Sequence, residues 1–560
     1  MKKAAQSLNE LVFAPLGGLG EIGMNAGLYG FGPPESRKWI LVDCGMSFGN
    51  EEFLPGIDVI FPDIRFLEEE RGNLLGIFIT HAHEDHIGAL TELWPRLRVP
   101  VYATKFALSL LETRRLSDPG SPKITFKEVK PRERISVGPF ELEYIPVAHS
   151  IPESNAIVLR TPLGMVLHSG DWRLDETPVV GEKTRQEDFE KLREEGVLAL
   201  VCDSTNVIAN GSNASELAVQ ESLKTIIAQS KGRVAVTTFA SNVARLKSIV
   251  DAAQACGRKV MLAGRAMERV VNVARECGYL DDSITFEPLD NFSRLPRNKT
   301  VLIMTGSQGE ARAALARVAA KEHSDIKLTE GDKVLFSART IPGNERTVSR
   351  IVNKLVEQGV EIITERDGLI HVSGHPKRDE LKAMYQWTRP KIAIPAHGEM
   401  LHLAEQAALA KEMDVSQVVI AKNGQMVRIA PGEAEIIDDI PSGRLFQDGE
   451  IIVDESDPAI SQRRKLSFSG IVSVALAIDQ KGNVVSGPTV DMKGIPEKKR
   501  NGEDMADFIA DTIVDVVKGI NRKQRSDPDF VENVVYKAVR SSVNVTWGKK
   551  PSCHVLILEV

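Results

Sequence analysis

The chain has 560 residues, which is too long for one ordinary hydrophobic core and predicts two to four domains. Hydrophobic residues make up 42% of the chain and charged residues 26%, which is typical of globular proteins and excludes a disordered or fibrous class. The net charge of −7 gives no global signal for nucleic acid, so a polyanionic partner would need a local basic patch.

The N-terminal segment and the cysteines indicate the compartment. The first residues, MKKAAQSLNELVFAP, lack the apolar core of a signal peptide, and no apolar run of about 18 residues follows. The five cysteines are scattered and odd in number, which predicts reduced thiols rather than a disulfide framework. We therefore expect a cytoplasmic protein without a membrane partner.

Short apolar runs that end in polar residues fill residues 1–208. Examples are KWILVDCG, GIFITH, FELEYIPVAH and MVLHSGD. Each is short enough for a strand and is bounded by turn-forming residues. The pattern predicts strands of a buried sheet that present polar side chains at their ends.

The pattern changes at about residue 209. Asn213 and Glu216 have the spacing of an N-cap and N3 pair, which predicts a helix that runs to about Gln229. Strand and helix patterns then alternate from RVAVTTF (233–239) to residue 366, as in βαβ units with a parallel sheet.

Histidines at strand ends return in HVSGH (371–375) and IPAHGE (394–399). This return predicts that residues 209–366 are an α/β domain inserted into a first domain made of 1–208 and 367–430. Residues 431–462 are acidic and have no clear periodicity, which predicts an irregular connector. Residues 463–560 have the pattern of two strands, two helices and two strands, a small α+β domain.

The segment FITHAHEDHIGAL (78–90) carries the strongest chemical signal. It places three histidines and an aspartate at His81, His83, Asp85 and His86, directly after an apolar run. A sharp loop after a strand can direct these side chains into one cavity, and imidazole and carboxylate groups suit Zn²⁺ or a similar divalent ion. A solvated polar loop is the alternative, but this density of ligands favours metal.

One loop offers too many ligands for one ion and too few for two complete shells. Further candidates lie at strand ends, namely His149 in PVAHSIPES, Asp171 in LHSGDWRLD and His397 in IPAHGE. Together with the loop they make seven groups. Two ions that share one carboxylate would use all seven and would favour a phosphoryl displacement.

Several motifs together resemble a known family. HAHEDH is similar to the HxHxDH signature of the metallo-β-lactamase superfamily, and DSTN (203–206), HVSGH and IPAHGE resemble three motifs of its β-CASP nuclease branch. With PLGGLGEIGMN (15–25) and TGSQGE (305–310), nearly the whole chain resembles the bacterial ribonuclease J family. The resemblance implies an α/β fold class: a metallo-β-lactamase αββα sandwich, an inserted β-CASP domain and a small α+β C-terminal domain.

The resemblance also implies a role for each residue. Asp43 and Asp203 would orient the ligands, and Asp85 and His375 would take part in catalysis, with His375 at the scissile phosphate. The seven predicted ligands would form two groups that share one carboxylate: His81, His83 and His149; Asp85, His86 and His397; and Asp171 as the bridge.

Two segments have the pattern of phosphate-binding turns, a strand end followed by small polar residues and a helix start. In the resembling family the 5′-terminal nucleotide lies near them. An ordinary helix cap is the alternative for each. The predicted substrate-binding residues are Ser241 and Asn242 in the first turn, and His371, Val372, Ser373, Gly374 and His375 in the second.

The resemblance implies a metal-dependent ribonuclease with two divalent ions, Zn²⁺ or Mn²⁺. A bridging hydroxide would cleave RNA to leave 5′-phosphates, with both 5′→3′ exonuclease and endonuclease activity in RNA processing and decay. The enzyme would prefer 5′-monophosphorylated RNA and form a homodimer or homotetramer. Some relatives hold a structural cation near residues that match Asp58 and Asp448, although the segment around Asp448 is shorter here.

Three other functions remain open. A small-molecule hydrolase of the same superfamily would not need the insertion or the motifs after it. A catalytically weak RNA-binding subunit would lack ligands, and none is missing here. A DNA-directed β-CASP nuclease is disfavoured only by analogy, through the C-terminal domain.

Overall fold

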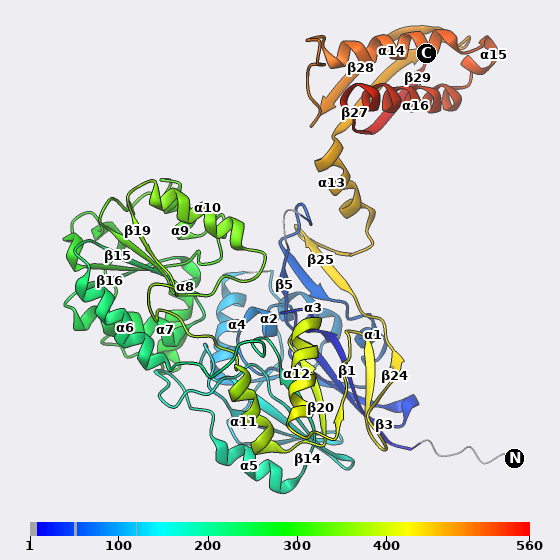
Figure 1. Ribbon diagram of the computed structural model, residues 1–560. Helices are drawn as coiled ribbons and strands as arrows, with labels where there is room; N and C mark the ends of the chain where they lie inside the picture. The colour runs from blue at the N-terminus through cyan, green and yellow to red at the C-terminus, as the bar shows by residue number, and fades with distance from the viewer. Residues whose placement is uncertain (1–7, 50–52, 119) are drawn as a thin grey trace, which may run out of the picture. The chain divides into compact units, whose positions relative to one another are not determined.

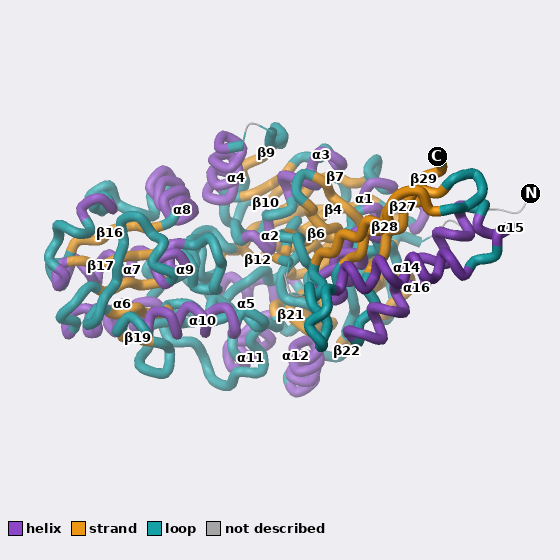
Figure 2. The backbone as a smooth tube through the Cα atoms, turned by 90° about the horizontal axis from the view of Figure 1, so that it is seen from above, coloured by secondary structure: helices purple, strands orange, loops and turns teal. Residues whose placement is uncertain are grey.

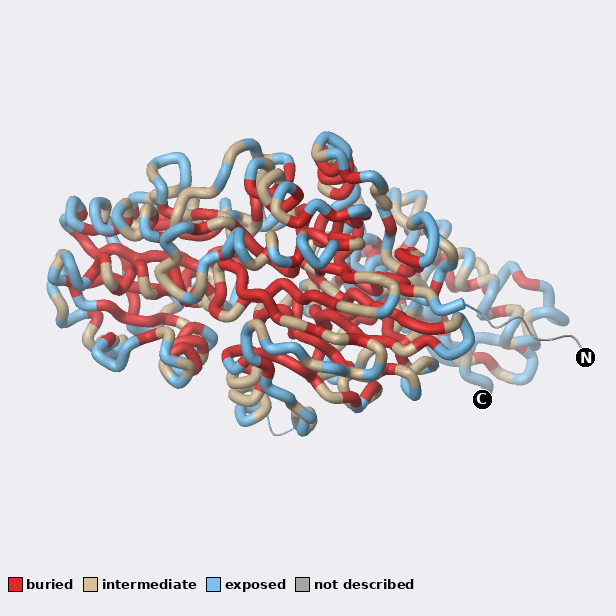
Figure 3. Tube along the Cα trace, turned by 90° about the horizontal axis from the view of Figure 1, so that it is seen from below, coloured by how far each residue is buried: buried red, intermediate tan, exposed pale blue. Residues whose placement is uncertain are grey.

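The computed structural model describes residues 8–49, 53–118 and 120–560. The chain divides into two compact units, one with the residues up to Ser47 and Phe61–Arg444, the other with Phe48–Ile60 and Leu445–Val560. Buried residues follow the strands, whereas exposed residues gather in loops and on the outer faces of helices (Figure 3). Among the described residues, no helix combines the length and apolarity needed to cross a bilayer.

In the first of these units, two large sheets form the part that lies outside the inserted segment. The eight-stranded sheet has the order β24 (Glu435–Asp439), β23 (Gln425–Ala430), β1 (Glu10–Gly17), β3 (Ala26–Gly32), β4 (Lys38–Val42), β7 (Leu74–Phe78), β8 (Val101–Ala103) and β9 (Phe126–Glu128). The seven-stranded sheet has the order β10 (Arg134–Val137), β11 (Phe140–Pro146), β12 (Asn155–Thr161), β13 (Gly164–His168), β14 (Val197–Asp203), β20 (Ile392–Ala396) and β22 (Gln417–Val418). A two-stranded pair joins β2 (Leu19–Gly20) to β21 (Gly398–Glu399).

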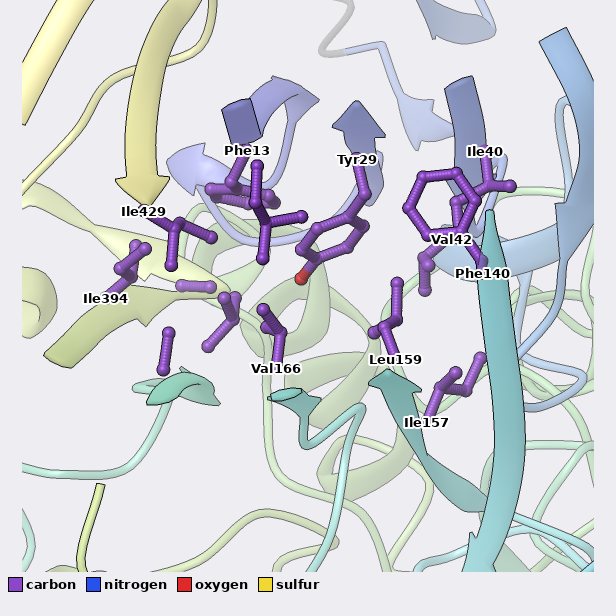
Figure 4. Close-up of a cluster of buried hydrophobic side chains, with 14 of the residues drawn as sticks. Phe13, Tyr29, Ile40, Val42, Phe140, Ile157, Leu159, Val166, Ile394 and Ile429 are labelled. Carbon is purple, nitrogen blue, oxygen red and sulfur yellow. The ribbon is translucent and has the colours of Figure 1, made fainter. Parts of the chain in front are cut away.

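The inner faces of the two sheets pack against each other. Phe13 and Tyr29 from the first sheet meet Leu159 and Val166 from the second in one buried cluster (Figure 4). Because the outer faces are also covered, strands such as β1 and β4 are apolar on both sides instead of alternating.

Helices cover the outside of both sheets. On the first sheet, the ring of Phe66 lies edge-on to Trp39 with centroids 5.3 Å apart. On the second sheet, Phe189, Leu381 and Leu409 join the outer core. The predicted αββα sandwich is therefore confirmed. The helices of this part are α1 (Arg65–Glu69), α2 (Glu84–Ile87), α3 (Leu90–Leu97), α4 (Lys105–Ser117), α5 (Gln186–Glu195), α11 (Arg378–Thr388) and α12 (Met400–Glu412).

The inserted segment forms its own α/β layer, coloured green in Figure 1, between β14 and β20. The segment has five parallel strands. The strand order is β16 (Lys259–Ala263), β17 (Thr300–Met304), β15 (Val234–Thr237), β18 (Lys333–Phe336) and β19 (Glu361–Ile363). The helices are α6 (Glu216–Gln229), α7 (Val243–Ala255), α8 (Arg265–Glu276), α9 (Ala314–Ala319) and α10 (Glu345–Val356). Helices flank the strands (Figure 2), and Leu315 of α9 and Leu355 of α10 enter the core.

The alternation predicted for this segment is confirmed, but the predicted start of its first helix is wrong. Ser215, not Asn213, is the N-cap of α6, and its side chain accepts a hydrogen bond from the Ala218 N–H. Asn213 instead binds Glu380 through its backbone and its side chain. Glu216 is buried and pairs with Arg245 of α7 at 2.6 Å, a tertiary contact that local spacing cannot reveal.

The second unit ends in a three-stranded sheet of β28 (Val484–Lys493), β27 (Ile471–Ile478) and β29 (Ser552–Glu559) with α14 (Met505–Gly519), α15 (Arg522–Arg525) and α16 (Pro528–Trp547). The prediction of two final strands is wrong, because α16 continues through a valine-rich stretch. Val535, Val539 and Val543 recur every four residues on its buried face, so helical packing outweighs their strand preference.

Residues 431–462 were predicted to be an irregular connector, and this prediction is wrong. They form β24, which pairs with β23, and then β25 (Arg444–Asp448), β26 (Ile451–Asp454) and the start of α13 (Pro458–Ser469). The strands β25 and β26 belong to a four-stranded sheet with β6 (Val59–Pro62) and β5 (Ser47–Phe48). The carboxylate of Asp448 forms an ion pair with Arg463 at 2.5 Å.

Candidate metal centre and RNA site

The predicted site residues lie at one edge of the sandwich. Asp43 follows β4 and His81 follows β7, which are parallel neighbours in the first sheet. Asp171 follows β13, Asp203 ends β14 and His397 follows β20, three consecutive parallel strands of the second sheet. Because parallel strands end at the same edge, both sheets deliver polar side chains to one place.

The first group contains His81, His83, His149 and Asp171, whose ligand-type atoms lie within 4.8 Å of one another. Nδ1 of His83 lies 3.0 Å from Nε2 of His81 and 3.1 Å from Nε2 of His149. Oδ2 of Asp171 lies 3.7 Å from Nε2 of both His81 and His149.

The second group contains Asp85, His86, His397 and again Asp171, also within 4.8 Å. Nε2 of His86 lies 3.2 Å from Oδ2 of Asp171, and Nε2 of His397 lies 3.2 Å from Oδ2 of Asp85. Asp171 is therefore common to both groups, which is the arrangement that the sequence predicted for a shared carboxylate.

The outward ring nitrogens of three of these histidines have partners. Nδ1 of His149 lies 2.7 Å from the Gly374 carbonyl oxygen and Nδ1 of His86 lies 2.7 Å from Oδ2 of Asp43. Nδ1 of His397 lies 2.7 Å from Oγ1 of Thr205. Such partners fix the ring orientation and leave Nε2 free to face the centre, as do the hydrogen bonds that orient metal-bound histidines.

The protonation of the two groups differs, because nearby carboxylates outweigh burial only at the histidines of the second group. Burial lowers the pKa of His81 and His149 well below the ordinary value and that of His83 to about 4, so these imidazoles are neutral. In His397 the carboxylates, Asp171 foremost, outweigh burial and raise the pKa to about 10. The carboxylates likewise raise the pKa of His86 against the effect of burial.

These residues fit divalent cations. Asp171 is buried, its pKa is held well below the ordinary range against the effect of burial by His397 and His86, and its Oδ1 has no hydrogen-bond partner among the described residues. An ionised buried carboxylate with an unused oxygen is costly unless a cation is nearby. Neutral imidazoles with carboxylates are a ligand set for zinc and for related ions.

His375 lies beside these groups, and its side chain is partly exposed. Its Nδ1 is 2.8 Å from Oδ2 of Asp203 and 3.8 Å from Oδ2 of Asp171. The two carboxylates outweigh burial and raise the pKa of His375. Asp203 also receives a hydrogen bond from the Thr205 backbone, so its position is fixed from two sides.

The predicted phosphate-binding segment HVSGH runs directly past the first group. A side chain at position 374 would bring Cβ to 2.6 Å from Cε1 of His149, so only glycine fits there. Oγ of Ser373 accepts a hydrogen bond from the His375 backbone, and the Val372 side chain is buried.

The remaining predicted residues of this surface differ in their environments. Burial and the nearby Arg245 lower the pKa of His371 to about 3, and its buried Nδ1 lacks a partner among the described residues. Asn242 is the N-cap of α7, with Oδ1 accepting from the Arg245 N–H, whereas Ser241 is partly exposed.

Three side chains at the centre were missed from the sequence. Nδ2 of Asn25 lies 3.1 Å from Nε2 of His86 and donates to the Asp85 carbonyl. Thr80 donates to Asp43, and Thr205 contacts His397. Asn25 ends PLGGLGEIGMN and Thr205 belongs to DSTN, so both lay in motifs already noted.

Comparisons with known protein families match every part of the chain that carries these features. Residues 24–222 match the metallo-beta-lactamase superfamily and residues 359–421 the Zn-dependent metallo-hydrolase RNA specificity domain. Residues 231–355 match the ribonuclease J beta-CASP domain and residues 458–560 the ribonuclease J C-terminal domain.

Curated relatives match over almost the full length. A ribonuclease J of Sinorhizobium meliloti is 50% identical over 551 residues and covers 98% of both chains. A ribonuclease J of Thermus thermophilus is 32% identical, over 97% of this chain and 94% of the other. A solved structure of a protein of unknown function from Enterococcus faecalis V583 shares the fold, with 16% identity and a TM-score of 0.52 over 75% of this chain and 100% of that chain.

The two facing sheets, the His/Asp centre at their edge and the inserted α/β layer define a metallo-β-lactamase-fold hydrolase with a β-CASP domain. Such a centre binds divalent metal. The chain belongs to the ribonuclease J family, and its activity is the metal-dependent hydrolysis of RNA.

Proposed function

We propose that this ribonuclease cleaves RNA to leave 5′-phosphates and acts both as a 5′→3′ exonuclease and as an endonuclease in RNA processing and decay. The observation that carries the proposal is the pair of ligand groups that share Asp171 beside His375. A shared carboxylate between two sites suits the in-line displacement of a phosphodiester.

The seven side chains would act as ligands in the two groups described above. Divalent ions bound there would acidify a water and polarise the phosphate oxygens. We propose Zn²⁺, with Mn²⁺ as the alternative, since imidazole and carboxylate serve both. Asp85 is the more exposed of the two ligand carboxylates, with 31% of its side chain accessible against 2% for Asp171, which suits it to orient the attacking water.

His375 would assist the other side of the reaction. Asp203 keeps its ring oriented, and Asp203 and Asp171 raise the pKa of His375, which favours the imidazolium form. A protonated imidazole can donate to a phosphate oxygen as negative charge develops and can protonate the departing 3′-oxygen. Asp43 would support the centre indirectly, because it holds both His86 and Thr80.

The 5′ end of RNA would bind along residues 371–375 and the turn at Ser241–Asn242. His371 supports this proposal, because its buried Nδ1 has no partner in the described part of the chain and the ring lies within the electrostatic influence of Arg245, Arg173 and Arg339. A positive environment with N–H and O–H donors stabilises one compact phosphate. We therefore propose a preference for 5′-monophosphorylated RNA.

One digestion tests this function. RNAs of one sequence that carry 5′-triphosphate, 5′-monophosphate or 5′-hydroxyl are incubated with the enzyme before and after chelation, and both ends of the products are analysed. The proposal expects metal-dependent products with 5′-phosphates and the fastest mononucleotide release from monophosphorylated RNA. Products with 3′-phosphates would contradict it.

A further inference from the structure

Arg339 is an exposed cation beside the site. It follows β18 at the carboxyl edge of the inserted sheet, and its side chain is exposed. Among the described residues it forms no ion pair, and Nη1 alone donates a hydrogen bond from its guanidinium, to Oδ1 of Asn206 at 3.0 Å. The other two arginines near His371 differ, because Arg173 and Arg245 are buried and paired with carboxylates.

The contact of the Arg339 guanidinium with Asn206 connects it to the catalytic side. Asn206 is the last residue of DSTN, the segment in which Asp203 holds His375. The positive charge of Arg339 also contributes to the lowered pKa of His371 in the proposed 5′-end segment. Arg339 therefore lies within electrostatic range of the surface along which the RNA is proposed to bind.

The TGSQGE segment fixes the backbone that carries this arginine. Nε2 of Gln308 donates to the Arg339 carbonyl at 2.9 Å, and Oε1 of Gln308 accepts from the Ile341 N–H at 2.8 Å. Gln308 is itself buried, so the loop after β18 is anchored while the guanidinium stays exposed. This arrangement holds a charge in a defined place, which an ordinary solvated arginine does not need.

We infer that Arg339 binds a backbone phosphate of the RNA next to the catalytic centre, with Asn206 holding the guanidinium in position for that contact. An arginine that donates one hydrogen bond to protein keeps its other N–H groups for a phosphate, which it can bind in a bidentate manner. The inference rests on the proposed function, because it places the bound RNA between His375 and the inserted domain.

The test compares steady-state RNA cleavage by Arg339→Gln with that by the wild-type enzyme at several KCl concentrations. We expect KM to rise about five- to tenfold with kcat nearly unchanged, because the lost contact serves binding in the ground state and the transition state alike. The slope of log(kcat/KM) against log[KCl], which is negative, should become less steep by about 0.7, the value for one phosphate contact with a single strand.

Two further variants separate this role from the alternatives. Arg350→Gln removes an exposed charge from α10 of the same domain and should leave both KM and the salt slope near wild type. Asn206→Ala removes the anchor but keeps the charge, so it should raise KM while the slope stays unchanged. If Arg339→Gln and Asn206→Ala change KM equally and neither changes the salt slope, the contact between Arg339 and Asn206 has only a structural role and the inference fails. Absence of RNA cleavage in the wild type would instead count against the proposed function.

Discussion

Oδ2 of Asp203 lies 2.8 Å from Nδ1 of His375, and this ion pair joins the end of β14 to the loop before α11. Two segments far apart in the chain therefore form one unit at the edge of the centre. The carboxylate orients the ring and favours its charged form. The DSTN segment contributes no predicted ligand, yet it positions the histidine that we propose acts on the RNA.

The first prediction concerns the pH dependence of turnover. The pKa of His375 is raised because Asp203 and Asp171 outweigh burial. If imidazolium is the active form, activity is present below this raised pKa and falls as the pH rises through it. Asp203→Asn removes one of the two charges, so the alkaline fall in kcat should move to lower pH. An unchanged alkaline limb in a pH–rate profile would show that His375 does not act as the acid.

The second prediction separates His375 from the metal ligands. Asp171→Ala should lower both bound metal and RNA cleavage, because Asp171 belongs to both groups. His375→Ala should lower turnover about 10²- to 10⁴-fold, the range for general acid catalysis, while metal content stays near wild type. Elemental analysis of the purified variants decides between them. Equal metal loss in both would mean that His375 is itself a ligand.

The third prediction concerns the 5′ end of the RNA. Ser373→Ala should narrow the preference for 5′-monophosphate over 5′-triphosphate more than it slows internal cleavage. Each lost charge-assisted hydrogen bond costs about 1.5–3 kcal/mol, roughly ten- to a hundredfold in rate. Circular RNA of the same sequence serves as the control for internal cleavage. Equal wild-type rates on the two linear ends would refute the pocket.

The fourth prediction concerns the buried pair of Glu216 and Arg245. Glu216→Ala leaves a buried guanidinium unpaired and should destabilise the α6–α7 region by about 3–5 kcal/mol, whereas Glu216→Gln should cost less. Arg245 lowers the pKa of Glu216 against the effect of burial. The stabilisation is therefore present above the ordinary pKa of 4.5 and is lost as the pH falls below it. Hydrogen exchange in residues 216–255 at pH 7 and pH 4 measures both effects, and a pH-independent difference would contradict this explanation.

The fifth prediction concerns self-association, which we propose as a homodimer or homotetramer. Helices α14 and α16 cover one face of the C-terminal sheet, whereas Leu556 and Leu558 of its edge strand are about half exposed. Removal of residues 471–560 should lower the number of chains per particle in light scattering. The paired substitution of Leu556 and Leu558 by Ser should do the same, and an unchanged assembly in both would refute the role of this face.

The sequence was most informative where chemistry depends on local spacing. HAHEDH and the strand-end residues His149, Asp171 and His397 all reach the centre, because short buried strands leave little freedom at their ends. Asn213 shows the limit of this reasoning. Its spacing to Glu216 suits a capping box, but Glu216 is buried against Arg245 and Asn213 binds Glu380. Such tertiary contacts outweigh the local preference for a helix cap, and the neighbouring sequence does not indicate them.

The predicted connector, residues 431–462, shows the same limit. The strands β24 and β25 are defined by their partners, and residues such as Asp438 and Asp439 have little strand preference of their own. Asn25 was missed because a lone asparagine after glycines is typical of a turn. Its contact with His86 arises only because the start of β3 approaches the histidine loop.

The parallel pairing of β14 with β20, from Ala199↔Ile392 to Asp203↔Ala396, also sets an order of events during translation. The ribosome makes the HAHEDH loop, His149 and Asp171 first, and it adds His375 and His397 only after the entire insertion. The second ligand group therefore needs β20 to dock beside β14, and Gly374, which orients His149 of the first group, also follows the insertion. Vectorial synthesis thus delays completion of the second ligand group until the entire inserted domain has been made.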